Sequence, residues 1–159
     1  MIKQLSTGLY VGNGDDLVDW PDDEGFAALH CAKDPWHRQM VGYDTRSAPE
    51  GPERLVARRG NRMALNMVDA PSAEFFDEEM VQAGLDFISE RIVAGDRVLV
   101  HCNMGVSRSP SMALLWMHRN DQEWAAMSFD EATEALRHRG VEYWPGNGIA
   151  GFLKAHWDD

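Results

Sequence analysis

Short apolar runs of strand length occur in the first half of the chain, and longer amphipathic segments dominate the second half. Apolar residues cluster at 5–12, 26–32, 62–68 and 97–101. Runs of this length favour β-strands, and the continuous apolar character of residues 26–32 indicates a strand buried on both faces. We therefore expect four strands at these places.

Helical periodicity is clearest from Pro71 onward, where apolar residues recur on one face and acidic residues lie near the expected helix start. Gly95 is a typical residue to end that helix. Residues 109–119 are apolar nearly all round and carry Pro110 in the first turn. This pattern predicts a second helix that is central and buried.

The remaining segments complete an α/β pattern. Residues 128–140 begin with a capping box and end on glycine, and a last helix is expected over about 148–157. Three prolines within residues 33–61 predict irregular surface excursions. Strands mixed with helices favour a largely parallel central sheet flanked by helices, and the length suits a single domain over residues 1–159.

The charge of the chain restricts its partners. The sequence has 15 basic and 26 acidic side chains and a net charge of −11, which disfavours binding to nucleic acid or to an anionic membrane. No stretch approaches the ~20 apolar residues of a membrane span, and the N-terminus lacks the pattern of a secretion signal. We expect a soluble cytoplasmic protein that acts as a monomer.

Two cysteines, Cys31 and Cys102, are too few for a disulfide framework, and neither has the spacing of a zinc ligand. Cys31 lies in an apolar run, where inert packing is the default, although a role in protecting Cys102 from oxidation stays open. The chemistry of Cys102 is therefore the more informative question.

The stretch VLVHCNMGVSRSPS, residues 98–111, joins a predicted strand to a predicted helix. Ligands of open α/β sheets bind beyond the carboxyl ends of strands, where the next helix presents free backbone N–H groups. A loop over residues 102–108 can point several amides at one anion, and Gly105 eases the backbone angles that this needs. The stretch therefore predicts a phosphate-binding loop.

Within this loop, Cys102 and Arg108 form a CxxxxxR pattern. Aligned donors at a helix N-terminus and a nearby cation favour a thiolate over a thiol. The planar fork of an arginine holds two oxygens of a phosphoryl group and balances the charge of its transition state. The alternative is an ordinary buried cysteine beside a surface arginine, but His101, Gly105 and Ser109 frame the pattern too specifically for that reading.

VHCNMGVSRSPS resembles the HCxxGxxR(S/T) signature of the cysteine-dependent protein tyrosine phosphatases, and it is most similar to the dual-specificity branch. The resemblance implies that Cys102 attacks phosphorus, that Arg108 clamps the phosphoryl group, and that Ser109 steadies the departing thiolate. His101 would support the thiolate from behind or would only satisfy a hydrogen bond of the core. The implied phosphate-binding residues are Asn103, Met104, Gly105, Val106, Ser107 and Arg108.

The leaving group needs a proton donor, and two aspartates compete for this role. Asp22 stands in a WPD sequence like that of the acid loop of many tyrosine phosphatases, but it lies 80 residues before Cys102. Asp69 lies only 33 residues before Cys102 and directly follows a predicted strand. In the phosphatases that the chain resembles, the acid lies about thirty residues before the cysteine, so the resemblance implies that Asp69 is the general acid. A parallel sheet would bring the end of its strand to the same edge as Cys102.

Two weaker candidates remain open. Asn147 resembles an asparagine near the active site of many dual-specificity phosphatases, although a turn residue is the simpler interpretation. A basic run could steer a phosphorylated ligand toward the site or could be a solvated surface. The run consists of Arg54, Arg58, Arg59 and Arg62.

The sequence thus predicts a dual-specificity-like phosphatase that hydrolyses phosphate monoesters through a cysteinyl-phosphate, without metal or organic cofactor. A phosphorylated protein is the expected substrate, with phosphotyrosine as the first candidate and phosphoserine or phosphothreonine as further ones. The alternatives are a phosphatase of RNA 5′ ends, inositol phosphates or glycans, and a module that binds phosphate groups without turnover. The absence of lysine from residues 102–109 and the acidic composition favour a protein substrate.

Overall fold

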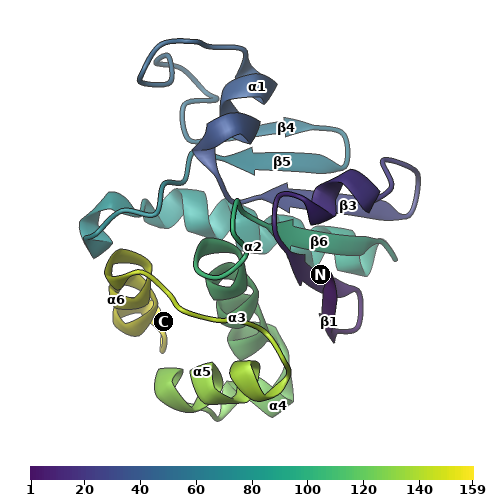
Figure 1. The fold of residues 1–159 in the computed structure, drawn as a ribbon, viewed down its shortest axis with the longest axis vertical. Helices are drawn as coiled ribbons and strands as arrows, with labels where there is room; N and C mark the ends of the chain where they lie inside the picture. Colours follow the sequence, from purple (N-terminus) through teal and green to yellow (C-terminus); the bar gives the residue numbers. More distant parts are fainter.

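A six-stranded sheet forms the centre of the computed structural model, which describes residues 1–159 (Figure 1). The strand order is β1-β2-β6-β3-β5-β4, with parallel pairing among the four central strands and antiparallel pairing at both edges. The predicted α/β fold with a largely parallel sheet is therefore confirmed. The strands are β1 (Lys3–Ser6), β2 (Leu9–Gly12), β3 (Phe26–His30), β4 (Val56–Arg59), β5 (Arg62–Leu65) and β6 (Arg97–His101).

Helices α2 and α3 pack side by side against one face of the sheet. At Gly84 of α2, an added Cβ would lie 2.8 Å from Met112 of α3 and 3.0 Å from Leu65 of β5, so the two helices and the sheet meet closely there. Helices α4, α5 and α6 then pack around α3 (Figure 1). The α-helices are α1 (Arg38–Val41), α2 (Glu78–Val93), α3 (Arg108–Asn120), α4 (Gln122–Ala125), α5 (Phe129–His138) and α6 (Asn147–His156).

The other face of the sheet is covered by the N-terminal part of the chain. Two short helical turns, η1 (Asp16–Asp19) and η2 (Lys33–His37), follow β2 and β3 there. A third, η3 (Ala73–Phe75), precedes α2 and packs against α6. Trp20, which follows η1, packs on Ala28 and Leu99 of the sheet.

Two predicted strands differ from the structure. The segment expected as one strand over 5–12 is a hairpin of β1 and β2, because Gly8 takes a left-handed conformation (φ 77°) that turns the chain back. The strand expected over 62–68 ends at Leu65, and it pairs with β4, which lies inside the segment expected to be irregular. Local composition did not reveal β4 because it is short and carries two arginines.

The helices follow the sequence pattern more closely. Asp77 caps α2 by accepting a hydrogen bond from Met80 N at 3.0 Å, so this helix begins among the acidic residues that were expected near its start. The capping box between Ser128 and Glu131 is confirmed at the start of α5. Helix α3 buries nine residues in a row, from Ser109 to Met117, as its apolar sequence predicted. The long central helix thereby holds its first turn rigidly at the edge of the sheet.

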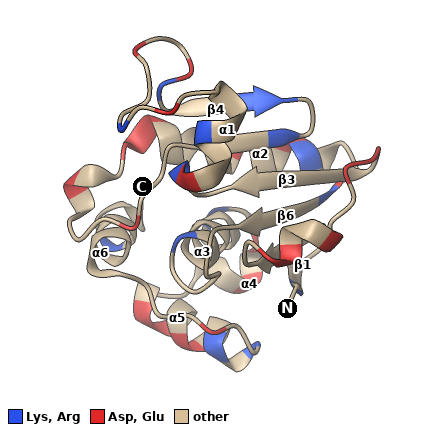
Figure 2. Cartoon of the chain, turned by 45° about the horizontal axis from the view of Figure 1, so that its top comes forward, with Lys and Arg blue, Asp and Glu red and all other residues tan.

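Charged residues lie mostly on the outer elements, and arginines gather on β4 (Figure 2) and at the start of β5. None of the helices combines the length and the apolar character that crossing a membrane requires. The basic run is neutralised rather than free, because each of its arginines forms a salt bridge with a carboxylate. The pairs are Arg54–Glu50, Arg58–Glu90, Arg59–Glu53 and Arg62–Asp22.

Candidate active site

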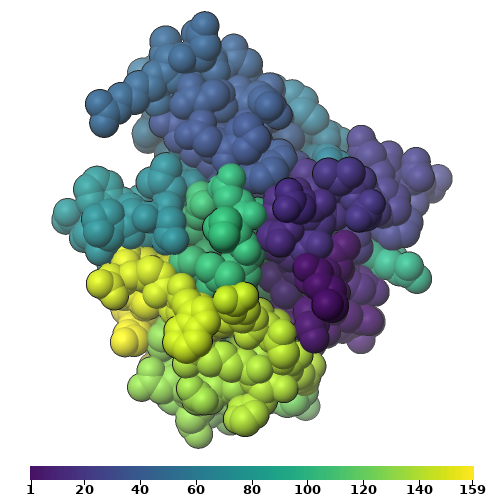
Figure 3. Space-filling view, in the orientation of Figure 1, coloured from purple at the N-terminus to yellow at the C-terminus, as the bar shows by residue number.

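A tight loop connects β6 to α3 at the carboxyl edge of the parallel strands. Gly105 lies at its apex with a φ of 75°, and an added Cβ there would lie only 3.0 Å from the carbonyl oxygen of Gly12. Both the backbone angle and the close approach therefore require glycine. In Figure 3 the green atoms of this loop reach the surface between the purple N-terminal segment and the yellow C-terminal segment.

The backbone amides of the loop are free to bind a ligand. None of the N–H groups of residues 103–108 donates a hydrogen bond to the rest of the protein. The loop runs directly into the first turn of α3, whose dipole adds partial positive charge at the same place. Free amides at a helix N-terminus are suited to an anion such as phosphate.

Arg108 is held over this loop by its terminal nitrogens. Nη1 donates to the carbonyl oxygen of Met67 at 3.0 Å, and Nη2 donates to Oδ1 of Asn103 at 2.8 Å. The Nε atom is buried and has no partner within the protein. Because a buried N–H without an acceptor is costly, this donor fits an oxygen of a bound anion.

Cys102 is 2% exposed at the base of the loop. Its Sγ lies 3.2 Å from Oγ of Ser109, and that hydroxyl also lies 3.2 Å from the carbonyl oxygen of Gly12. The single hydroxyl proton of Ser109 has two possible acceptors, so it can turn from Gly12 to the sulfur when the sulfur is a thiolate. Ser109 is thus placed to stabilise negative charge on Cys102.

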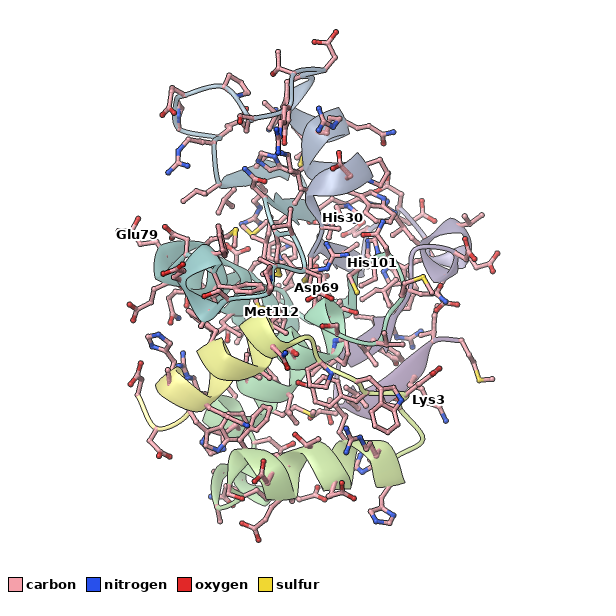
Figure 4. The ribbon with its side chains drawn as sticks, turned by 60° about the vertical axis from the view of Figure 1, so that its left-hand side comes forward. Lys3, His30, Asp69, Glu79, His101 and Met112 are labelled. Carbon is pink, nitrogen blue, oxygen red and sulfur yellow. The ribbon has the colours of Figure 1, made fainter.

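Asp69 lies beside the loop, as its spacing predicted that it should. Its Oδ1 accepts a hydrogen bond from Oγ of Ser107 at 3.2 Å, and the same Oγ accepts from the backbone N–H of Gly146 at 2.9 Å. Asp69 and His101 both lie near the middle of the molecule in Figure 4. A carboxyl group therefore lies next to the anion-binding loop.

Asp22 lies far from this loop at the opposite edge of the sheet. It is 79% exposed and forms a salt bridge of 3.3 Å with Arg62, the first residue of β5. The neighbouring Trp20 donates from Nε1 to the carbonyl oxygen of Ala27 and packs on the sheet. The WPD sequence therefore forms part of the core and the surface, and its aspartate does not approach Cys102.

A pair of buried histidines lies behind Cys102. His30 and His101 are neighbours in the register of β3 and β6, and Nδ1 of His30 lies 2.5 Å from Nε2 of His101. Nδ1 of His101 in turn faces the carbonyl oxygen of Cys102 at 3.2 Å. Burial lowers the pKa of His101 to about 4 and, together with the charge of His101, lowers the pKa of His30 to about 2.

Sequence reasoning did not identify His30, but a signal was present. Residues 26–32 and 97–101 both end their apolar runs in histidine followed by cysteine. Adjacent parallel strands in the same register place such repeated residues side by side. The second cysteine of this repeat, Cys31, is fully buried, and burial raises the pKa of its thiol.

Two large apolar side chains lie at the surface of the site; the sequence implied a role for the backbone of one, Met104, and did not assign the other, Trp144, to the site. Met104 is 74% exposed within the loop, and Trp144 is 64% exposed on the segment before α6. The backbone N–H of Trp144 donates to the carbonyl oxygen of Val106 at 2.8 Å, and Arg137 lies 4.3 Å above the indole ring. These contacts fix an apolar surface next to the anion-binding loop.

Two other groups lie outside the loop. Asn147 is the exposed first residue of α6, and the neighbouring Gly146 makes the contact with the loop instead. Glu78, His156 and Asp159 are the side chains close enough together to hold a metal ion, and they lie near the C-terminus, where two of them are exposed. The anion-binding loop itself presents N–H donors, which bind anions and not metal cations.

Comparison with known proteins gives a consistent picture. No family model matches the chain. The chain is 29% identical over 110 residues to dual specificity protein phosphatase 1B of Arabidopsis thaliana, which covers 67% of this chain and 58% of that protein. The chain therefore spans little more than half the length of this relative.

Solved structures share the fold at low sequence identity. A human tyrosine phosphatase-like serine/threonine/tyrosine-interacting protein superposes with a TM-score of 0.65 at 17% identity, over 98% of this chain and 95% of that chain. The PTP-2 phosphatase of Cydia pomonella gives a TM-score of 0.66 at 16% identity, over 97% and 88%. The chain has the protein tyrosine phosphatase fold. Its predicted resemblance to the dual-specificity branch is confirmed.

Proposed function

We propose that the protein is a phosphatase that hydrolyses phosphate monoesters through a covalent cysteinyl-phosphate. The observation that supports this most directly is the placement of the Cys102 sulfur beneath a loop whose six amides, from residues 103–108, have no other partner. A nucleophile next to an empty set of anion donors suits displacement at phosphorus.

In the first step, the loop amides and Arg108 bind the nonbridging oxygens and place phosphorus above Cys102. The thiolate attacks in line, the sulfur–phosphorus bond forms, and the bond to the leaving oxygen breaks. Asp69 protonates that oxygen, so the alcohol or phenol departs uncharged. Positioning and charge stabilisation supply most of the rate acceleration in reactions of this kind.

In the second step, Asp69 accepts a proton from water, which attacks the phosphorus of the cysteinyl-phosphate. The sulfur leaves as a thiolate, and the hydroxyl of Ser109 turns toward it from the carbonyl oxygen of Gly12. Inorganic phosphate then dissociates. His101 orients the carbonyl of Cys102 from behind through Nδ1.

The substrate that we propose is a phosphorylated protein. The Arabidopsis relative is named a protein phosphatase, and the net charge of −11 opposes the approach of RNA. Met104 and Trp144 offer an exposed apolar surface beside the loop, which suits the side chains of a peptide better than an inositol phosphate. We propose that the protein acts on such substrates as a monomer in the cytoplasm.

Turnover of an aryl phosphate tests the proposal. The wild-type protein should hydrolyse it equally well with and without a metal chelator, and vanadate should block the reaction. Cys102→Ser should abolish turnover while retaining the binding of vanadate or phosphate, because the loop amides remain. If Cys102→Ser keeps its activity, the mechanism is wrong.

A panel of substrates then separates the alternatives. Phosphotyrosine and phosphoserine peptides, a phosphoinositide and a 5′-triphosphate RNA should be compared at one ionic strength. Faster turnover of the peptides supports the protein substrate, and faster turnover of the phosphoinositide or the RNA replaces it. Binding of all phosphate groups without turnover would instead identify a recognition module.

A further inference from the structure

The side chain of Ser107 points away from the anion-binding loop to which its backbone belongs. The residue is 5% exposed and directly precedes Arg108. Its Oγ lies 3.2 Å from Oδ1 of Asp69 and 2.9 Å from the backbone nitrogen of Gly146. One hydroxyl therefore joins three segments that are distant in the sequence.

The hydrogen atoms of this contact can be assigned from chemistry alone. The N–H of Gly146 can only donate, so Oγ of Ser107 is its acceptor. The hydroxyl proton of Ser107 then points to Oδ1 of Asp69, which accepts it. With Oδ1 engaged in this way, Oδ2 is the oxygen left to carry a transferable proton.

Two glycines allow the segment that contains Asp69 to lie against the start of α6. At Gly146, an added Cβ would lie 2.8 Å from Oδ1 of Asp69. At Gly148, an added Cβ would lie 2.0 Å from the carbonyl oxygen of Ala70. The carboxyl group of Asp69 is thus confined between Ser107 on one side and the backbone of Gly146 on the other.

We propose that the Ser107 hydroxyl is a positioning residue for the general acid, which fixes Oδ1 of Asp69 and leaves Oδ2 to exchange the proton with the leaving group. This inference rests on the proposed phosphatase activity and on the role of Asp69 in it. It assigns to the Ser107 side chain a task separate from that of its backbone amide, which binds phosphate.

The effect of the leaving group distinguishes a positioning role from a structural one. Proton donation matters for a poor leaving group, such as an unsubstituted phenol, and matters little for a phenol with strongly electron-withdrawing substituents. In Ser107→Ala, kcat/KM, which reports the first chemical step, should fall about tenfold more for the poor leaving group than for the good one, because a displaced acid donates less efficiently. Ser107→Thr, which keeps a hydroxyl, should show most of the wild-type activity on the poor leaving group, so that the difference between the two substrates largely disappears.

A double-mutant cycle provides the sharper test. In the Asp69→Asn background there is no acid left to position, so adding Ser107→Ala should change the leaving-group ratio less than twofold. Ser107→Ala could instead lower the rate of hydrolysis of both substrates equally, and do so again in the Asp69→Asn background. In that case the Ser107 hydroxyl only supports the loop, and the proposal is overturned.

Gly146→Ala tests the same contact without touching Ser107. The backbone at Gly146 has φ −61° and ψ 157°, which alanine adopts without strain, so the added methyl group acts mainly by displacing the carboxyl group of Asp69. This variant should reproduce the leaving-group defect of Ser107→Ala. A wild-type ratio in folded Gly146→Ala, judged by circular dichroism, would count against the proposal.

Failure of the underlying function gives a different result. If Cys102→Ser remains active, the cysteinyl-phosphate mechanism fails and this inference fails with it. If Cys102→Ser is inactive but Asp69→Asn shows no leaving-group effect, the phosphatase stands and the role of Asp69, with that of Ser107, is overturned. The inference is supported only when Asp69→Asn and Ser107→Ala share one defect that does not add.

Discussion

Nδ1 of His30 lies 2.5 Å from Nε2 of His101, and the two rings meet nearly edge to face at an interplanar angle of 81°. The carbonyl oxygen of Cys102 can only accept, so Nδ1 of His101 carries a proton and Nε2 is the acceptor. Nδ1 of His30 must then be the donor. This chain of hydrogen bonds links the end of β3 to the backbone of the proposed nucleophile.

Removal of the His30 ring should destabilise the protein. His30→Ala leaves Nε2 of His101 buried without a donor and opens a cavity, so unfolding in urea should show a loss of about 2–4 kcal/mol. His30→Asn keeps an N–H near the position of Nδ1 and should recover about 1 kcal/mol of that loss. If the two variants are equally unstable, the hydrogen bond between the histidines contributes nothing.

Mild acid should weaken the fold through the same pair. In the folded protein, burial lowers the pKa of His101 to about 4 and that of His30 to about 2, whereas both titrate near 6.5 in the unfolded chain. Between pH 7 and pH 5 the unfolded chain therefore binds more protons than the folded protein. The stability of the fold decreases as the pH is lowered through this range.

The linkage relation gives a size for this effect. For each histidine that stays neutral in the folded state, the protein loses about 2 kcal/mol of stability when the pH is lowered from 7 to 5. The free energy of unfolding, measured in urea at several pH values, should fall less steeply in His30→Asn than in the wild type. Parallel slopes for the two proteins would show that His30 is not held neutral by the fold.

Ser109→Ala should slow the second chemical step. Without its hydroxyl, the departing sulfur loses the donor that lies 3.2 Å away, and loss of one donor to a developing anion costs about 10²-fold in rate. Rapid mixing with an aryl phosphate should then show a burst of phenol followed by slow turnover, with phosphorylated protein detectable by mass spectrometry.

Ser111, two residues after Ser109, provides a matched control. Ser111 is also buried in the first turn of α3, but its hydroxyl contacts the hydroxyl of Tyr143 at 2.7 Å and not the sulfur. Ser111→Ala should cost about 1 kcal/mol of stability and should produce no burst. A burst in Ser111→Ala would attribute the effect to the packing of α3 and not to the hydroxyl of Ser109.

The fold and the loop were predictable from the sequence because their signals are local. Apolar strand runs, the capping box from Ser128 and the 102–108 loop each lie within a few consecutive residues. The position of Asp69 followed from the spacing that the family resemblance implies, supported by the rule that parallel strands end at a common edge. The WPD sequence lies at the opposite edge because it belongs to the connection that runs back from the end of β2, through η1, to the start of β3.

The contacts that sequence reasoning missed are all between distant segments. The pairing of His30 with His101 depends on the register of β3 and β6, which local patterns do not fix. The contact of Ser107 with Asp69 and Gly146 depends on how closely α6 approaches the loop, since the three residues are 38 and 39 positions apart. Such contacts become visible only once the chain is folded.

The choice between the two aspartates makes the last prediction. Asp69→Asn should lower kcat/KM for an aryl phosphate with a poor leaving group by about 10²–10⁴, because the amide cannot donate a proton in the same way. For the same substrate, the kcat/KM of Asp22→Asn should stay within a factor of two of the wild-type value, because the Asp22 carboxylate is 79% exposed and paired with Arg62. The measurement is kcat/KM for a series of phenyl phosphates whose phenols differ in pKa. A steep leaving-group dependence in Asp22→Asn and a shallow one in Asp69→Asn would reverse the assignment and would require the WPD segment to move across the sheet during catalysis.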